Sequence, residues 1–455
     1  MKKMSRRRVI IRKIKISVFF SFLVLRGEAS FRTLIKKMKI KLFKTKSIYN
    51  ILTPLTGLHF FDLESTPRDT EILLTDIKQT IEFQKINTYE QSVLKAVLEL
   101  LNHSLKSQDF NAAKKNELET LIFQNQNQVR WDFLEGIEVL LNLAGYFSLS
   151  YQVRAILYAQ YLEKYQNNAR VDYFDVRKLC LIYLANGEFE QAVDLLEKKA
   201  NTWGKLNKNR HSLLSTLAHS QKRNLFNPYE RKNTVERLGL SLIRGKTLAL
   251  IGPAPNVDRY LTEIGDDWET KVAIGYRGQE GLKDIGIDIS YYNKALQIFL
   301  TSNKNPEPEM SFLENLQMAI CKGRTKFSKH YLLESKVKTS LAKVDDLLFN
   351  GYANMMQNVI FDLARYSPAR VKCFGFNLFL AKQEERYNKQ YKHYQNSRNF
   401  DLYGLAFHSI SSNYEFTKML HTLGYLEADD DLAEVLSLGT EIYMQRMEQM
   451  FFEEQ

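Results

Sequence analysis

Two strand-like apolar runs in this chain each end in a glycine followed by polar residues, a pattern that could bind a phosphorylated ligand. Residues 247–256 read TLALIGPAPN, and residues 370–377 repeat the order of strand and glycine in RVKCFGFN. A buried strand that stops at a tight glycine turn, just before a helix, is where open α/β sheets bind nucleotides. We therefore predict that the turns at Gly252 and Gly375 lie beside a nucleotide or another phosphorylated ligand.

Backbone N–H groups could supply the contacts to a phosphate. We expect those of Gly252, and those of Asn350 and Gly351 at a predicted helix start, to form an anion cradle that the helix dipole reinforces. The alternative is that these glycines only form turns. Pro253 and Pro255 carry no N–H group, so the first turn offers few backbone donors.

Polar side chains near the strand ends could hold the rest of a nucleotide. Asn256 and Asn377 are predicted to bind nucleotide hydroxyl groups, while Gly375 would let a ligand approach the backbone closely. Tyr292 and Asn293 end another predicted strand and could contact a phosphate or a sugar. Together with the backbone donors, these residues make up the predicted binding site.

His408 is the candidate for proton transfer. It lies between Phe407 and Ser409 in a loop-like sequence, and an imidazole titrates near neutral pH, which suits a general base. A structural role is the alternative. His330, in the apolar sequence HYLL, is interpreted as a core or strand-end residue.

Metal chemistry is not expected from this sequence. The acidic residues at 345–346 and 429–431 fall at predicted helix starts, where carboxylates complement the helix dipole. Cys180, Cys321 and Cys373 have neither metal-ligand spacing nor the pattern of a disulfide framework. The motifs GxxxxGKS/T, GxSxG and HExxH do not occur. We expect neither a metal ion nor a separate cofactor.

The second part of the chain, residues 245–455, alternates short apolar runs with amphipathic helices, which is typical of βαβ units and a Rossmann-like parallel sheet. Strands are predicted at residues 247–251, 271–274, 287–291, 329–333 and 370–374. Helices are predicted at residues 257–264, 296–300, 312–319, 352–366, 415–423 and 431–452. The sequence therefore predicts an α/β domain that positions the two glycine turns.

Residues 70–235 carry helical periodicity and almost no strand signal. Residues 179–200 look like a helical hairpin of the tetratricopeptide type with Gly187 in its turn, and residues 139–165 form a weaker copy around Gly145. The two glycines are 42 residues apart, whereas that repeat has a period of roughly 34, so a regular solenoid is not predicted. This all-α region is either a scaffold packed against the next domain or a groove for a peptide.

The net charge of +12 is concentrated at the N-terminus. Residues 1–47 hold sixteen Lys or Arg and one acidic residue, Glu28, so the rest of the chain is near neutral. The apolar residues 16–25 are too few to cross a bilayer, which takes about 20. We expect this tail to lie on an anionic membrane surface. A disordered basic tail and a cleaved signal peptide are the alternatives, and specific nucleic-acid binding is not indicated.

Taken in order, these segments resemble the sialyltransferases of glycosyltransferase family 29 and the related bacterial enzymes that transfer Kdo or sialic acid. The first motif of that family is similar to TLALIGPAPN, IGDDW and KVAIGYRG, and the second is similar to residues 350–377. The third resembles the segment that starts at His408, with Glu415 seven residues on. The resemblance covers roughly residues 245–425.

The resemblance implies an inverting glycosyltransferase that moves Kdo or sialic acid from a CMP-sugar donor to a bacterial surface glycan, either lipopolysaccharide or capsule. His408 would be the general base for the acceptor hydroxyl, without a metal ion. The protein would lie in the cytoplasm, peripheral to the inner membrane. A transferase with another nucleotide-linked donor, and a non-catalytic helical-repeat adaptor with a nucleotide-binding domain, are the alternatives.

Overall fold

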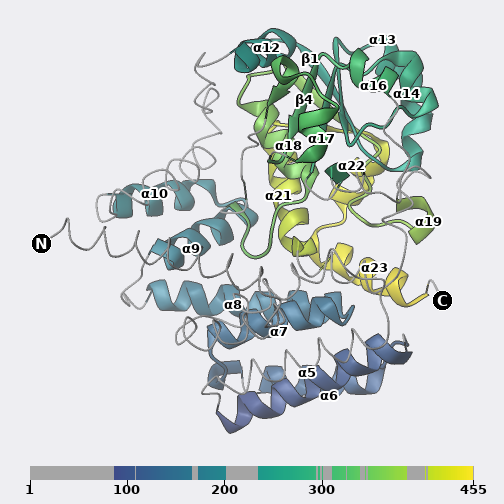
Figure 1. Ribbon diagram of the computed structural model, residues 1–455. Helices are drawn as coiled ribbons and strands as arrows, with labels where there is room; N and C mark the ends of the chain where they lie inside the picture. Colours follow the sequence, from purple (N-terminus) through teal and green to yellow (C-terminus); the bar gives the residue numbers. More distant parts are fainter. Residues whose placement is uncertain are drawn as a thin grey trace, which may run out of the picture.

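The computed structural model describes residues 87–453, with gaps at 108, 125, 167–172, 201–233, 294–295, 298–299, 301–309, 324, 339–343, 345–346, 387–404 and 406–407. The tail predicted at residues 1–47 and the acidic residues 345–346 therefore lie outside the described residues. One half of the molecule is a stack of helices, and the other half is a sheet with helices on both faces (Figure 1).

The sheet has seven strands, all parallel, in the order β5-β4-β3-β2-β1-β6-β7. The first strand, β1, lies inside the sheet. The strands β2 to β5 follow one another on one side of β1, and β6 and β7 lie on its other side. The α/β prediction is confirmed at this level. The strands are β1 (Thr247–Ile251), β2 (Thr270–Ile274), β3 (Ile289–Tyr292), β4 (Met318–Cys321), β5 (Val337–Lys338), β6 (Arg370–Phe374) and β7 (Glu427–Ala428).

Alternate side chains of the strands enter two separate cores, because successive residues of a strand point to opposite faces. In β1, Leu248 and Leu250 pack into one core, which also contains residues of α12 (Thr234–Ile243), α18 (Met355–Ala364), α21 (Ile410–Thr422) and α22 (Asp430–Ser437). Ala249 and Ile251 pack into the other core, which contains residues of α13 (Leu261–Asp266), α14 (Glu280–Ile285), α16 (Met310–Asn315) and α17 (Lys326–His330). Burial on both faces explains the continuous apolar sequence of β1.

The connecting elements fill these two faces. They are α12 (Thr234–Ile243), η3 (Pro255–Tyr260), α13 (Leu261–Asp266), α14 (Glu280–Ile285), α16 (Met310–Asn315), α17 (Lys326–His330), η4 (Glu334–Lys336), α18 (Met355–Ala364), α19 (Gln383–Arg386), α21 (Ile410–Thr422), α22 (Asp430–Ser437) and α23 (Thr440–Glu453).

One predicted strand is wrong. Residues 329–333 form the end of α17 and a turn, and His330 is exposed there rather than in a core. The fourth strand is β4, whose four residues are all buried and whose first two, Met318 and Ala319, fall at the end of the helix predicted at residues 312–319. The two-residue strands β5 and β7 were also missed. A strand this short has no alternation to detect, and an apolar run of four residues is equally compatible with a buried helix.

The N-terminal half consists of helices that pair as hairpins. Gly145 and Gly187 lie in the turns of α7–α8 and α9–α10 with φ angles of +81° and +76°, as predicted. The elements are α5 (Thr88–Ser107), α6 (Ala112–Gln124), η1 (Gln126–Gln128), α7 (Trp131–Leu143), α8 (Phe147–Gln166), α9 (Tyr173–Ala185) and α10 (Phe189–Ala200). No helix of the described residues is both long and apolar enough to cross a membrane.

The helical half packs directly on the α/β half, with α21 and α23 between them (Figure 1). The Phe451 ring of α23 meets the Phe147 ring of α8 edge-on at a centroid distance of 5.8 Å. The Glu448 carboxylate accepts hydrogen bonds from the Ser148 N–H (3.0 Å) and from the Lys115 ammonium (2.5 Å). The C-terminal helix therefore joins the two halves into one packed body.

The turns at Gly252 and Gly375 approach so closely that adding one methyl group at Gly252 should lower the stability of the protein. A Cβ atom at Gly252 would lie 2.3 Å from the Gly375 carbonyl oxygen, so Gly252→Ala should lower the free energy of unfolding by about 1–3 kcal/mol, measured by urea denaturation. The control is Gly265→Ala, where the added methyl meets only the Ile285 side chain, at 3.1 Å. Equal stability of the two variants would contradict the close approach.

Candidate functional site

Two glycine turns meet at the carboxyl edge of the sheet, where β1 and β6 are neighbours. The Gly252 N–H donates to the Phe374 carbonyl (2.7 Å), and the Ala254 N–H donates to the Gly375 carbonyl (3.2 Å). The Gly375 N–H donates to the Asp429 carboxylate (2.8 Å). The Gly252 N–H, which we expected to cradle a phosphate, therefore has its partner within the protein, and this glycine serves the close packing of two strand ends.

Asp429 ties this turn to the next helix. Its carboxylate also accepts a hydrogen bond from the Leu432 N–H (2.8 Å) and caps the N-terminus of α22, which confirms the predicted capping role. Burial raises the pKa of Asp429, although the two backbone hydrogen bonds oppose the increase. The start of α22 is thereby fixed beside the β1 and β6 ends.

A groove opens beside these turns, with a volume of about 1200 Å³. It lies where the chain order reverses from one side of the sheet to the other, the position at which open α/β sheets bind ligands. Asn256 and Asn377, both predicted as binding residues, line it. Charged side chains of both signs complete the wall: Arg259, Lys382, Glu385, Asp431, Glu434, Arg446 and Glu453.

Asp431 organises one side of the groove. Its carboxylate accepts hydrogen bonds from the Asn256 amide (2.5 Å) and from Arg259. Burial alone would raise the pKa of Asp431, but these two donors outweigh it and lower that pKa. The Asn256 Oδ1 atom is buried and has no hydrogen-bond partner among the described residues.

The loop after β6 has a backbone that residues other than glycine rarely adopt. Leu378 and Phe379 have φ angles of +47° and +69°. The Asn377 Oδ1 atom accepts a hydrogen bond from the Phe379 N–H (3.0 Å), and the Tyr443 hydroxyl donates to the Leu378 carbonyl (2.5 Å). Such strain persists only where other contacts hold it, and it is concentrated at ligand sites. Asn377 therefore shapes the groove wall as well as facing the groove.

His408 lies just before α21, at a second place on the same edge. Its Nδ1 atom is 3.1 Å from the Tyr352 carbonyl oxygen. A carbonyl can only accept, so the ring carries its proton on Nδ1 and its lone pair on Nε2. The Asn413 amide donates to the carbonyls of Tyr352 (3.0 Å) and His408. These bonds fix the orientation of the imidazole.

The surroundings of His408 favour its neutral form. The pKa of His408 is lowered to about 4 in total, because burial and, to a smaller extent, the nearby Lys322 ammonium outweigh the hydrogen bond to Tyr352, which raises it. At pH 7 the imidazole is therefore neutral, with its one proton on Nδ1, and it titrates well below the neutral range expected from the sequence.

Asn350 and Gly351 do not begin a helix as predicted, because α18 begins at Met355 with Asn354 as its N-cap, and the two residues pack instead against the His408 loop. Gly351 has a φ angle of +77°, and a Cβ atom there would lie 2.6 Å from the Ser409 Cβ and 2.9 Å from the His408 carbonyl. The Asn350 N–H donates to the Ser412 hydroxyl (3.2 Å). Asn350 and Gly351 therefore hold the His408 loop, and the Asn350 N–H has its partner within the protein.

Tyr292 and Asn293 have structural partners at the end of β3. The buried Tyr292 hydroxyl donates to the Tyr276 carbonyl (2.9 Å). The Asn293 Oδ1 atom accepts a hydrogen bond from the Leu296 N–H (2.7 Å). These side chains join the ends of neighbouring segments, and their predicted contact with a ligand stays a prediction.

The structure thus brings the predicted residues together at two places rather than one. Asn256 and Asn377 line the groove beside the glycine turns, whereas His408, just before α21, meets Asn350 and Gly351 in the loop that precedes α18. No protein-family model matches this chain, and comparisons with curated proteins and with solved structures found no match. Among the described residues, no three His, Cys, Asp or Glu side chains lie together in a way that could hold a metal ion.

A buried cluster of charges from the helical half reaches the His408 loop. The Arg154 side chain is fully buried in α8, and its guanidinium donates to Glu138 (2.9 Å), to the Ser409 hydroxyl (2.9 Å) and to the Ser412 hydroxyl (2.8 Å). A fourth bond reaches the Glu415 carboxylate (3.2 Å). Arg154 therefore binds the first turn of α21, next to His408.

Asn350 also belongs to this cluster of buried charges. The Asn350 amide donates to the other oxygen of Glu138 (2.6 Å) and accepts from the Lys178 ammonium (3.3 Å). Burial raises the pKa of Glu138, and the Arg154 charge and hydrogen bonds oppose that increase. Burial raises the pKa of Glu415 as well, again opposed by Arg154. Both segments that hold His408 are thus connected to α7, α8 and α9.

Sequence reasoning missed this cluster, although one signal was present. Arg154 follows Val153 and precedes Ile156 and Leu157, so a charged residue interrupts an apolar helix that is otherwise buried. A buried arginine needs carboxylate partners, and those come from segments 16 and 261 residues away. Glu415, the acidic residue in the segment that resembles the third family motif, accepts hydrogen bonds from Arg154 and from the Tyr158 hydroxyl (3.0 Å).

Removing the central cation should destabilise the whole fold. Arg154→Met leaves the buried Glu138 without its positive partner, so the free energy of unfolding should fall by about 3–5 kcal/mol in urea denaturation. Arg370→Met is the matched control, because the Arg370–Glu427 pair is more than 40% exposed on both sides (56% and 44%), and it should cost about 1 kcal/mol or less. Similar losses in the two variants would show that the buried cluster contributes little.

The lowered pKa of His408 makes stability depend on pH. The unfolded chain takes up a proton at this residue near pH 6.5, and the folded protein does so only near pH 4. The free energy of unfolding should therefore fall by up to about 3 kcal/mol as pH drops from 6.5 to 4. His408→Gln should remove that part of the decrease, measured by urea denaturation across this range. An unchanged profile would contradict the neutral, buried imidazole.

Proposed function

We propose that this chain is an inverting glycosyltransferase that moves an acidic sugar, Kdo or sialic acid, from a CMP-sugar donor to a bacterial surface glycan. The observation that supports it most is the polar groove at the point where the strand order reverses, lined by Asn256 and Asn377. Its volume of about 1200 Å³ is enough for a nucleotide sugar, since pockets for small ligands commonly measure roughly 300–1,000 Å³.

In this proposal, side chains rather than backbone N–H groups bind the donor phosphate. The N–H groups of Gly252 and Asn350 already donate within the protein. Arg259, Lys382 and Arg446 line the groove and can each donate to a phosphate oxygen. The Asn256 side chain lines the same groove and would bind a hydroxyl of the nucleotide. These contacts fit a donor with a single phosphate and a ribose.

His408 would act on the acceptor. The acceptor hydroxyl oxygen attacks the anomeric carbon, the bond from that carbon to the CMP phosphate oxygen breaks, and the hydroxyl proton passes to Nε2 of His408. CMP then leaves, and a single displacement inverts the anomeric centre. The fixed Nδ1–H tautomer leaves Nε2 as the atom that would take the proton. A pKa of about 4 makes this imidazole a weaker base than one that titrates near neutral pH, so the support for this role comes from the tautomer and not from the pKa.

The helical half is proposed to be a scaffold with hairpins of the tetratricopeptide type. Arg154 and Lys178, both from this half, contact the segments that hold His408. The tail at residues 1–47 is proposed to hold the enzyme at the inner membrane, next to a glycolipid acceptor. A transferase that uses another nucleotide-linked donor would occupy the same groove.

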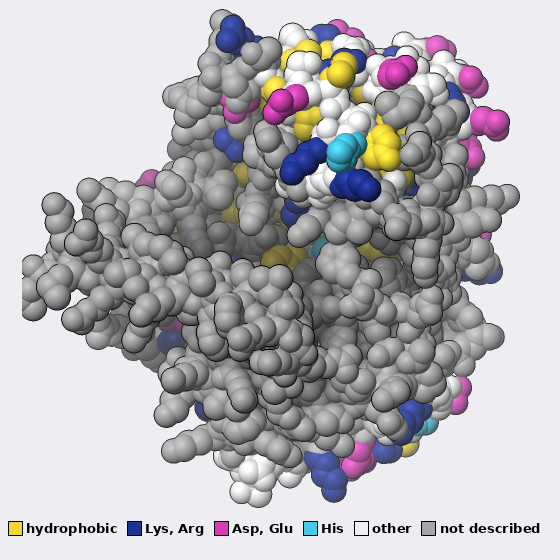
Figure 2. Space-filling model, in the orientation of Figure 1, with side chains coloured by type: hydrophobic (Ala, Val, Ile, Leu, Met, Phe, Trp, Pro, Cys, Tyr) yellow, Lys and Arg dark blue, Asp and Glu magenta, His cyan; other side chains and the backbone are white. Residues whose placement is uncertain are grey.

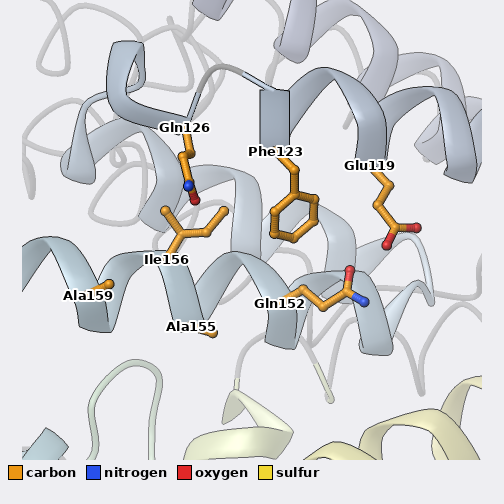
Figure 3. Close-up of a pocket in the computed structure, with 7 residues that line it drawn as sticks. All are labelled: Glu119, Phe123, Gln126, Gln152, Ala155, Ile156 and Ala159. Carbon is orange, nitrogen blue, oxygen red and sulfur yellow. The ribbon is translucent and has the colours of Figure 1, made fainter.

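One observation favours an adaptor as a second candidate function. A shallow groove of about 530 Å³ lies between α6 and α8, where Phe123, Ile156 and the small side chains Ala155 and Ala159 face one another (Figure 3). Phe123 is 36% exposed. Such a surface fits an apolar peptide side chain. If this were the function, the protein would retain its role in glycan assembly when His408 is replaced.

The donor prediction can be tested with purified protein. CMP should bind more tightly than UMP or GMP in calorimetry, and Asn256→Ala and Asn377→Ala should each weaken CMP binding. His408→Ala should keep CMP affinity but slow the release of CMP from CMP-Kdo or CMP-sialic acid in the presence of acceptor by roughly 10²–10⁴-fold.

The control for the groove is Asn293→Ala, because the Asn293 side chain caps the backbone at Leu296 and does not line the groove. Absence of any CMP binding would refute the proposed donor. Binding of CMP with full transfer activity in His408→Ala would refute the role of the histidine alone.

A further inference from the structure

The short helix α17 presents a basic face to solvent. Lys326, Lys329 and His330 are all exposed, and their spacing of three and four residues places them on one side of the helix. Lys or Arg side chains gather around a histidine over this part of the molecule, with hydrophobic side chains beside them (Figure 2). From residue 322 to 338 the sequence has six Lys or Arg and one acidic residue, Glu334.

A large apolar side chain projects next to this face. Leu333 is 66% exposed, more than any other large hydrophobic residue among those described. The adjacent Tyr331 and Leu332 are partly exposed. Burying such a group away from water is favourable, so a partner that is both apolar and anionic would match Leu333 and the neighbouring lysines.

The helix α17 is anchored to the protein by its buried side. The Phe327 ring is buried and packs on the Tyr292 ring at a centroid distance of 5.0 Å. Thr325 and Ser328 form a capping box at the N-terminus of α17. The basic face and Leu333 are therefore presented by a fixed element.

We propose that Lys326, Lys329, His330 and Leu333 form a membrane-docking surface for an anionic lipid bilayer. Lysines near such a surface are attracted by the lipid headgroups, while a leucine enters the boundary between headgroups and acyl chains. A lipid surface provides both chemistries over a flat area, which suits a protruding face without a groove. This inference concerns a described surface separate from residues 1–47 and does not rest on the proposed reaction.

Docking here would orient the candidate active site. Lys322, at the end of β4 and just before α17, lies close enough to His408 to influence its pKa. The carboxyl edge that carries His408 is thus adjacent to the docking surface. An acceptor anchored in the same membrane would reach the site without leaving the bilayer.

The test uses the full chain and two kinds of vesicle, phosphatidylcholine alone and phosphatidylcholine with phosphatidylglycerol. The three native cysteines are buried, so Leu333→Cys can be labelled selectively with a polarity-sensitive fluorophore. Its emission should shift to the blue with the anionic vesicles only. Ile442→Cys on α23, 48% exposed, is the matched control and should show no shift.

A second measurement removes the charges. Lys326→Gln with Lys329→Gln should weaken binding to the anionic vesicles at least tenfold, since each lysine near the surface contributes roughly fivefold. Lys95→Gln with Lys106→Gln, two exposed lysines of α5, makes the same change in net charge and should weaken it less than threefold as a rough bound. No shift at position 333, or equal loss in the two double variants, would overturn the proposal and assign any lipid binding to other residues.

Discussion

The arrangement of this molecule depends on the buried charge of Arg154. A guanidinium without water must have partners on every side, and here they come from α7, from the start of α21 and from Glu415. These bonds link the two halves of the chain in the relative position that the structure shows. Apolar contacts such as Phe147 with Phe451 add free energy to the interface, but they tolerate small displacements that the hydrogen-bonded cluster does not.

The same constraint reaches the backbone beside His408. Ser409 has a φ angle of +47°, which costs of order 1 kcal/mol or more for a residue with a side chain. Its hydroxyl accepts a hydrogen bond from Arg154 (2.9 Å), and its carbonyl accepts one from Asn413 (3.2 Å). The strained turn is thus held by a residue of the other half, and it is this turn that aims the imidazole.

The sequence predicted the central strands and their glycine turns because these features are local. β1 is apolar on both faces, β6 ends in the buried residues Cys373 and Phe374, and Gly252 and Gly375 follow the two strands. It could not predict β5 and β7, which are two residues long, or the Arg154 cluster, which joins segments far apart in the chain. The sequence also predicted that the site residues lie at one edge of the sheet. It could not predict that Asn256 and Asn377 line the groove while His408 lies apart from them, because this depends on how loops far apart in the chain pack together.

This division sets a geometric requirement on any reaction at the site. A donor whose nucleotide lies between Asn256 and Asn377 must extend its sugar along the carboxyl edge toward α18 and α21 to meet His408. The edge between them is made by the ends of β1, β2 and β3, where the Tyr292 hydroxyl is bonded to the Tyr276 carbonyl. The Tyr292 hydroxyl thereby joins the ends of β2 and β3, and the Asn293 side chain fixes the turn that follows β3. Tyr292 and Asn293 would then matter by shaping this edge, without having to touch the phosphate.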